Sequence, residues 1–254
     1  KRNIVGWHYI YRLRKSECKD DPFVHFYLTL RDKENRIYSD QQLTKLPSID
    51  PSHPHASEWV IRERSATELF VYLRLLDKGL DILEIGCGNG WLSNKLATIP
   101  RSNVTGIDVN GVELEQAKRV FGDSNNLRFL HGDIRNGLLE NELFDIIVFA
   151  ASIQYFENLQ EILLCAIHHL NSRGCIHIID SCFYNAGEVN NARKRSKSYF
   201  NKIGFPEMTA YYFHHSINDL KNFNYRIVYD SRANFPQTQK RDRLFPWICI
   251  EENQ

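Results

Sequence analysis

Three glycines alternate with other residues directly after an apolar run, and this pattern is well suited to binding a ligand. The run Ile82-Leu-Glu-Ile85 is followed by Gly86, Gly88 and Gly90, and helical spacing of apolar residues begins at Trp91. Glycine permits a tight turn and lets a ligand approach the backbone closely. The first turn of the following helix leaves N–H groups unpaired. The pattern predicts a nucleotide or nucleoside cradle at the carboxyl end of the first strand of an open α/β sheet.

Three carboxyl groups occupy matching positions near the ends of successive predicted strands. Glu84 lies two residues before the loop, Asp108 follows the apolar run 104–107, and Asp133 follows the run 127–130. A buried acid such as Glu84 needs an N–H or ammonium partner, and an acid at the position of Asp108 can bind both ribose hydroxyls. Asp133 would then be within reach of an exocyclic amine. We expect each acid to hold one part of a single ligand.

Each of these residues also has a purely structural interpretation. Taken alone, Glu84 is a strand-end acid, Asp108 a helix cap and Asp133 a turn residue. Their order, each at a strand end, favours the common ligand. The loop is GxGxG and not the dinucleotide fingerprint, because Trp91 stands where the third fingerprint glycine is expected, and a dehydrogenase is therefore the least favoured enzyme.

Together these motifs resemble those of the class I S-adenosylmethionine-dependent methyltransferases over residues 65–254. The resemblance implies that the loop holds the methionine moiety, the acid after the second strand the ribose, and the Gly-Asp pair the adenine. S-adenosylmethionine would be the cofactor and S-adenosylhomocysteine the product. The cofactor-binding residues that it assigns are Glu84, Gly86, Cys87, Gly88, Gly90, Asp108, Val109, Asp133, Ile134 and Ala150.

The alternation of strand and helix patterns calls for a parallel sheet with right-handed crossovers. The resemblance implies the full α/β fold: a three-layer, Rossmann-like, seven-stranded, mostly parallel sheet with an antiparallel last strand. A polar loop joins the last two strands, 225–229 and 246–250, which indicates an antiparallel pair. Residues 1–57 form an N-terminal extension or lid, in which the alternating stretch 23–30 suggests a hairpin. Residues 58–254 form the methyltransferase domain, with a helical insert at about 184–210 after strand five.

The remaining secondary structure follows from apolar periodicity and from glycine or polar breaks. Helices are predicted over 57–76, 113–121, 159–170 and 186–203, and a short helix capped by Ser216 runs to 223. Strands are predicted over 144–151 and 175–179, with a turn at 171–174 before the second of them.

The acceptor of the methyl group should lie beyond the fourth and fifth strands, near residues 150–155 and 180–184. Because displacement at a sulfonium chiefly requires alignment, few catalytic residues are needed. The sequence does not fix a catalytic residue, and the candidates are His214, Tyr155 and Gln154. Ala150 and its neighbour replace the acid that metal-dependent relatives place after strand four, so no metal is expected.

Two added segments could cover the acceptor. The insert carries five basic residues between Arg193 and Lys202 against one acid, which suits a lid, a contact for phosphate or nucleic acid, or simply a solvated helix face. Residues 1–64, with Trp7, Trp59, Arg62 and Arg64, are the other candidate lid.

Bulk properties narrow the function further. The net charge of +1 disfavours a general polyanion-binding protein, and the longest apolar stretch, 146–153, is too short to cross a bilayer. Six cysteines without a CxxC pair or zinc spacing, and no leader pattern, indicate the cytoplasm. We expect a methyltransferase for a small-molecule acceptor at N, O or C. An RNA or protein methyltransferase and a non-catalytic cofactor-binding module remain alternatives, and the oligomeric state stays open.

Overall fold

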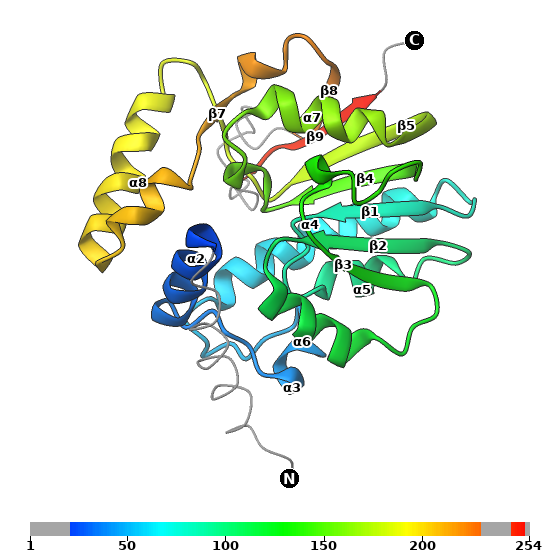
Figure 1. Ribbon diagram of the computed structural model, residues 1–254, viewed down its shortest axis with the longest axis horizontal. Helices are drawn as coiled ribbons and strands as arrows, with labels where there is room; N and C mark the ends of the chain where they lie inside the picture. The colour runs from blue at the N-terminus through cyan, green and yellow to red at the C-terminus, as the bar shows by residue number, and fades with distance from the viewer. Residues whose placement is uncertain (1–20, 230–244, 252–254) are drawn as a thin grey trace, which may run out of the picture.

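Seven strands form one sheet with helices on both faces (Figure 1). The computed structural model describes residues 21–229 and 245–251. The strand order is β3-β2-β1-β4-β5-β9-β8, and β9 runs antiparallel to both of its neighbours while the other pairs within β3–β5 are parallel. This confirms the predicted fold class. The strands are β1 (Asp81–Ile85), β2 (Asn103–Asp108), β3 (Leu127–His131), β4 (Phe144–Ala150), β5 (Leu170–Ile179), β8 (Asn224–Tyr229) and β9 (Trp247–Glu251).

Two separate apolar cores lie on the two faces of the sheet. Alternate side chains of a strand point to opposite faces, so Ile82 joins one core and Leu83 the other. The first core is covered by α4 (Ala56–Arg74), α5 (Trp91–Leu96) and α6 (Gly111–Phe121), and the second by α7 (Leu159–His168). Burial on both faces explains the continuous apolar runs of the central strands.

The predicted N-terminal hairpin is wrong, because this segment is a helix, α2 (Pro22–Lys33). The Asp21 side chain accepts a hydrogen bond from Val24 N at 3.2 Å, and Pro22 at the first position suits a helix start. Val24 and Leu28, four residues apart, share the buried face. A short helix, α3 (Asp40–Leu43), follows. Trp7, with the rest of residues 1–20, lies outside the described residues.

The predicted turn at 171–174 is also wrong, since these residues belong to β5. The pairing of β5 with β4 shifts register between Phe144 and Ile146, and Arg173 has φ +68°. The polar residues therefore form a bulge inside the strand, where an irregular backbone keeps some turn character. The predicted helix capped by Ser216 is only the 3₁₀ turn Ile217–Leu220, and the joining loop over 230–244 lies outside the described residues.

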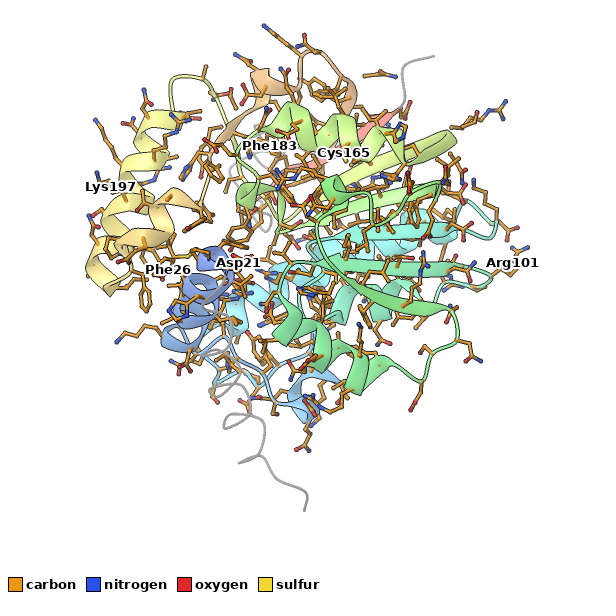
Figure 2. The ribbon with its side chains drawn as sticks, viewed as in Figure 1. Asp21, Phe26, Arg101, Cys165, Phe183 and Lys197 are labelled. Atoms are coloured by element: carbon orange, nitrogen blue, oxygen red, sulfur yellow. The ribbon has the colours of Figure 1, made fainter. Side chains whose placement is uncertain are left out.

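The insert is a helix, α8 (Val189–Ile203), that ends at Gly204 as predicted. It stands away from the sheet and beside α2 (Figure 1). A small apolar cluster joins the two segments through Leu30, Phe200 and Met208, with Phe26 packed against it. Figure 2 shows Lys197 of α8 at the rim of the molecule and Phe26 of α2 between the two helices. A short parallel pair, β6 (Phe183–Tyr184) with β7 (His215–Ser216), and the 3₁₀ turn Pro206–Ala210 flank α8.

Among the helices of residues 21–229 and 245–251, none has the length and apolar character needed to cross a bilayer.

Trp59 ties the N-terminal extension to the sheet, which gives a test of stability. Its ring is buried and meets Trp91 edge-on at 5.3 Å, and its Nε1 donates to Tyr38 Oη at 2.7 Å. Trp59→Ala should lower the free energy of unfolding by about 3–5 kcal/mol in urea denaturation, because a large buried side chain is removed. The control Val60→Ala, at a side chain 65% exposed, should change it by no more than about 0.5 kcal/mol. Equal effects of the two changes would contradict this role.

Candidate active site

A cavity of about 310 Å³ opens at the carboxyl ends of the central strands. Ligands of open α/β sheets bind at this edge. The cavity brings together six of the residues that the sequence assigned to the cofactor: Gly86, Gly88, Asp108, Val109, Asp133 and Ile134. Aromatic side chains from added or loop segments, Phe23, Phe156 and Tyr211, complete its wall.

The glycine loop has a conformation that only glycine fits at two positions. Gly86 has φ +74°, and a Cβ there would lie 2.5 Å from Ser152 Cβ. Gly90 has φ +76°, and a Cβ there would lie 2.5 Å from Phe129 Cζ. Gly90 ends the loop as the N-cap of α5 and does not line the cavity. Its contribution is to turn the chain into the helix.

Asp108, at the end of β2, is held by the loop itself. Its Oδ2 accepts a hydrogen bond from Gly88 N at 2.7 Å, and its Oδ1 accepts one from Asn110 N at 2.8 Å. Burial raises the pKa of this carboxyl, although these two N–H donors oppose the shift. The side chain is therefore fixed at the cavity wall by backbone donors, without a cation.

Glu84 is the most deeply placed acid of the site. It lies on the same face of β1 as Ile82, next to α5, and only 2% of it is exposed. Ser93 Oγ donates to its Oε2 at 2.5 Å. Burial raises the pKa of Glu84 to about 8, and the nearby Asp108 adds to the shift, although the hydrogen bonds from Ser93 oppose it. It lines a narrow compartment of about 90 Å³ that adjoins the first cavity and shares Gly86 and Gly88 with it.

Asp133, after β3, has a cationic partner that the sequence analysis did not assign. Arg135 Nη2 donates to its Oδ2 at 2.5 Å, and Arg135 N donates to its Oδ1 at 2.9 Å. Burial alone would raise the pKa of Asp133, but the hydrogen bonds from Arg135 outweigh it and lower the pKa. The Arg135 guanidinium also lies 5.8 Å from the centre of the Phe156 ring.

The narrow compartment contains two other residues of the original assignment, Cys87 and Ala150, together with charged groups that the sequence did not reveal. Arg31 of α2 reaches it, and its Nε is buried without a hydrogen-bond partner among the described residues. Burial works against the Arg31 charge, but the neighbouring Tyr27 and Glu113 raise its pKa.

Glu113 contributes a further acid from α6. Its Oε2 accepts from Asn110 Nδ2 at 3.0 Å and lies 3.2 Å from where a Cβ on Gly88 would stand. Burial raises the pKa of Glu113 to about 7. In the sequence, Asn110 and Glu113 have the spacing of a helix cap, and the structure shows that cap as well. Arg31 could have been placed only if residues 22–33 had been recognised as a helix.

A third cavity, of about 450 Å³, continues from Ala151, Gln154 and Tyr155 toward the end of β5. It contains residues from both stretches that the sequence assigned to the acceptor side, including Asp180, Ser181 and Cys182. Its roof is formed by α2 and α8. Arg36 and Arg62 on its wall bind the Glu58 carboxylate at 2.6 and 2.8 Å. Burial opposes ionisation of Glu58, but Arg36 and Arg62 lower its pKa to about 2.

Two of the three catalytic candidates line the cavities, and the third does not. Tyr155 and Gln154 line the third cavity and the narrow compartment, and Tyr155 also lines the first cavity. Burial raises the pKa of Tyr155, which keeps its hydroxyl neutral. His214 lines none of the three, and Ser196 Oγ lies 2.8 Å from its Nε2. Burial lowers the pKa of His214 to about 4.

Comparison with known proteins shows what part of this chain is similar to. Residues 82–174 match the model of a methyltransferase domain. The chain is 32% identical over 99 residues to malonyl-[acyl-carrier protein] O-methyltransferase 1 of Ilyobacter polytropus, an alignment that spans 39% of this chain and 37% of that protein. The chain thus spans well under half the length of this curated relative.

Solved structures share the fold. The plantazolicin methyltransferase BpumL, in complex with a triazolic desmethylPZN analog and SAH, has a TM-score of 0.56 at 17% identity, with 96% of each chain covered. Magnesium protoporphyrin IX methyltransferase of Synechocystis PCC 6803, with bound SAH, has a TM-score of 0.55 at 16% identity, covering 88% of this chain and 93% of that one. Residues 82–174 therefore match a methyltransferase domain, and the fold is similar to that of methyltransferases solved with SAH, in agreement with the resemblance drawn from the glycine loop and the three acids.

Proposed function

We propose that this protein transfers a methyl group from S-adenosylmethionine to a small-molecule acceptor at a nitrogen, oxygen or carbon atom, without a metal. One observation carries the proposal: Asp108 and Asp133 line one cavity, and Glu84 lines a compartment that shares the glycine loop with it. When bound, S-adenosylmethionine supplies a methyl group already activated by its sulfonium.

The charges of the site suit the parts of this cofactor. Glu84, which is bound only to Ser93 among the described residues, would accept the ammonium group, and Arg31 Nε, which has no hydrogen-bond partner within the part of the chain that the structure describes, would donate to the carboxylate. Asp108 would accept from the ribose hydroxyls, and Asp133 from the adenine amine. Val109, Ile134 and Phe156 offer apolar surface for the adenine ring.

The third cavity is the proposed acceptor site because Tyr155 and Ala151 form part of its wall and of the cofactor cavity. Tyr155 and Gln154 would align the acceptor, and alignment is the main requirement of an in-line displacement. Residues 21–57 and the insert of about 184–210 are the proposed lid. Enclosure by these segments favours a small molecule. The names of one relative and one structural neighbour specify a malonyl group on an acyl-carrier protein and magnesium protoporphyrin IX.

An RNA or protein acceptor is the second candidate, supported by the exposed basic side chains of α8: Arg193, Lys194, Arg195, Lys197 and Lys202. Salt-dependent RNA binding that survives neutral substitution of these residues would remove its support. The state of the cysteines bears on the compartment. The cysteines at 87, 165, 175, 182 and 249 are free thiols, and we therefore place the activity in the cytoplasm.

The direct experiment combines cofactor binding with turnover. Calorimetry should detect one S-adenosylhomocysteine per chain, and incubation with S-adenosylmethionine labelled on its methyl group and fractionated metabolites should yield a labelled small molecule. Binding without transfer to any fraction, to RNA or to protein would indicate a non-catalytic cofactor-binding module. Absence of binding by a folded sample would refute the proposal.

Asp108 gives a test of the ribose assignment. Asp108→Ala should weaken S-adenosylhomocysteine binding by about 1–3 kcal/mol in calorimetry, because charge-assisted hydrogen bonds to the ligand are lost. The matched control is Asp123→Ala, at an exposed position, which should leave the affinity unchanged. If Asp108→Ala binds as tightly as the unaltered protein, the ribose assignment is wrong.

Glu84 makes binding depend on pH with a defined sign. Its pKa is about 8 in the free protein, and a bound ammonium group favours the carboxylate, so binding expels a proton below that pH. The affinity for S-adenosylhomocysteine should therefore rise from pH 6 toward pH 8, by at most about tenfold per pH unit. Glu84→Gln should bind more weakly at pH 8 and show a shallower dependence. An identical slope in both proteins would exclude Glu84 as the group that titrates.

A further inference from the structure

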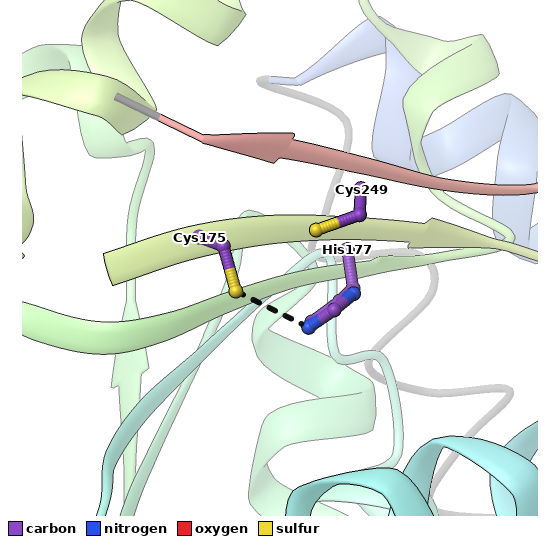
Figure 3. A group of neighbouring side chains, drawn as sticks. All are labelled: Cys175, His177 and Cys249. Carbon is purple, nitrogen blue, oxygen red and sulfur yellow. Dashed lines mark hydrogen bonds between the residues drawn. The ribbon is translucent and has the colours of Figure 1, made fainter. Parts of the chain in front are cut away.

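Three side chains of the types that bind metal ions lie together where β5 pairs with β9, away from the cavities described above (Figure 3). Cys175 and His177 are two residues apart and so share one face of β5. Cys249 of β9 stands directly opposite His177 in the antiparallel register. Their ligand atoms all lie within 4.8 Å of one another. Sequence spacing did not predict this group, because only strand pairing brings Cys249 to the other two residues.

The distance between two of the ligand atoms matches the coordination shell of zinc. Cys175 Sγ lies 3.4 Å from His177 Nε2. Zn–S and Zn–N bonds of about 2.3 and 2.0 Å at a tetrahedral angle would separate these atoms by about 3.5 Å. Two thiolates and an imidazole also bind zinc in preference to hard cations such as Mg²⁺. Cys175 Sγ and His177 Nε2 therefore have the separation that a bound ion requires, and the Cys249 sulfur lies within 4.8 Å of both.

We propose that Cys175, His177 and Cys249 form a zinc site that clips β9 to β5. His177 and Cys249 are fully buried, whereas Cys175 is only partly buried and gives the solvent side of the cluster. A water molecule at that side would complete four-coordination. The ion would reinforce the one antiparallel junction of β5, where the C-terminal strand enters the sheet.

In the metal-free protein, Trp247 determines which ring nitrogen of His177 carries the proton. Its Nε1 donates to His177 Nδ1 at 3.1 Å, so a neutral imidazole carries its proton on Nε2 and donates it to the Cys175 sulfur. Zinc needs the Nε2 lone pair and two thiolates. On binding, the imidazole proton therefore moves to Nδ1, and the two thiol protons pass to solvent. Nδ1 then no longer accepts from the indole, so Trp247 must change partners.

The first experiment is a Co²⁺ titration of the reduced full chain, followed by displacement with Zn²⁺. One equivalent of Co²⁺ should produce thiolate-to-cobalt charge-transfer absorption and the bands of a tetrahedral ion, and Trp fluorescence should change in parallel. One equivalent of Zn²⁺ should abolish the absorption and raise the unfolding temperature. Absence of a thiolate–cobalt signal in the folded, reduced protein would overturn the proposal, whatever the variants do.

Variants locate the site. Cys175→Ser and Cys249→Ser should each weaken Zn²⁺ binding by at least the roughly 10–100-fold that losing an outer-shell partner costs, whereas the control Cys165→Ser, on α7, should bind normally. Trp247→Phe should bind Zn²⁺ more tightly, because no indole donor then opposes Nδ1–H. If Cys249→Ser fails to fold, the partly buried Cys175→Ser decides. Full retention of the cobalt signal in Cys175→Ser would refute the assignment. Binding of S-adenosylhomocysteine should stay unchanged throughout, which separates this test from that of the methyltransferase.

Discussion

Carboxyl groups buried around a glycine-rich turn are the constraint on which the site depends. Glu84, Asp108 and Glu113 lie close to the same loop, and burial raises the pKa of each. In the free protein, backbone N–H groups, one hydroxyl and one amide side chain are their hydrogen-bond partners. Such an arrangement costs free energy that a cationic ligand rich in hydrogen-bond donors can recover. The scaffold therefore holds a site that is more stable with its ligand than without it.

The sheet and its two cores stabilise a fold that contains these buried carboxyl groups. Parallel strands end at one edge, so residues that are remote in sequence reach one cavity without long loops. Two apolar cores hold the strands from both faces, and the glycines at 86 and 90 leave space that Ser152 and Phe129 fill. The apolar cores stabilise the fold, while the free-energy cost of burying carboxyl groups arises only at the strand ends.

Much of this could be predicted from the sequence, because it depends on local pattern. Apolar runs identified the central strands, and the glycine after α8 marked the end of that helix. The errors arose where tertiary contacts outweigh pattern. The alternating stretch 23–30 satisfies both strand and helix periods, and only the cap at Asp21 with packing on Val112 decides for the helix. The position of Arg31 depends on that packing, and the Asp133–Arg135 pair depends on side-chain geometry. Sequence spacing alone encodes neither.

Under the proposed function, the two added segments would adapt a common cofactor site to a particular acceptor. Leu30 of α2 and Phe200 of α8 meet in one small cluster, and Tyr155 packs against it while lining the cofactor cavity. A change of acceptor would therefore alter the contacts of the lid and of Tyr155, and leave the glycine loop as it is. In agreement with this separation, the matched domain covers residues 82–174, whereas the segments proposed to enclose the acceptor lie outside that range.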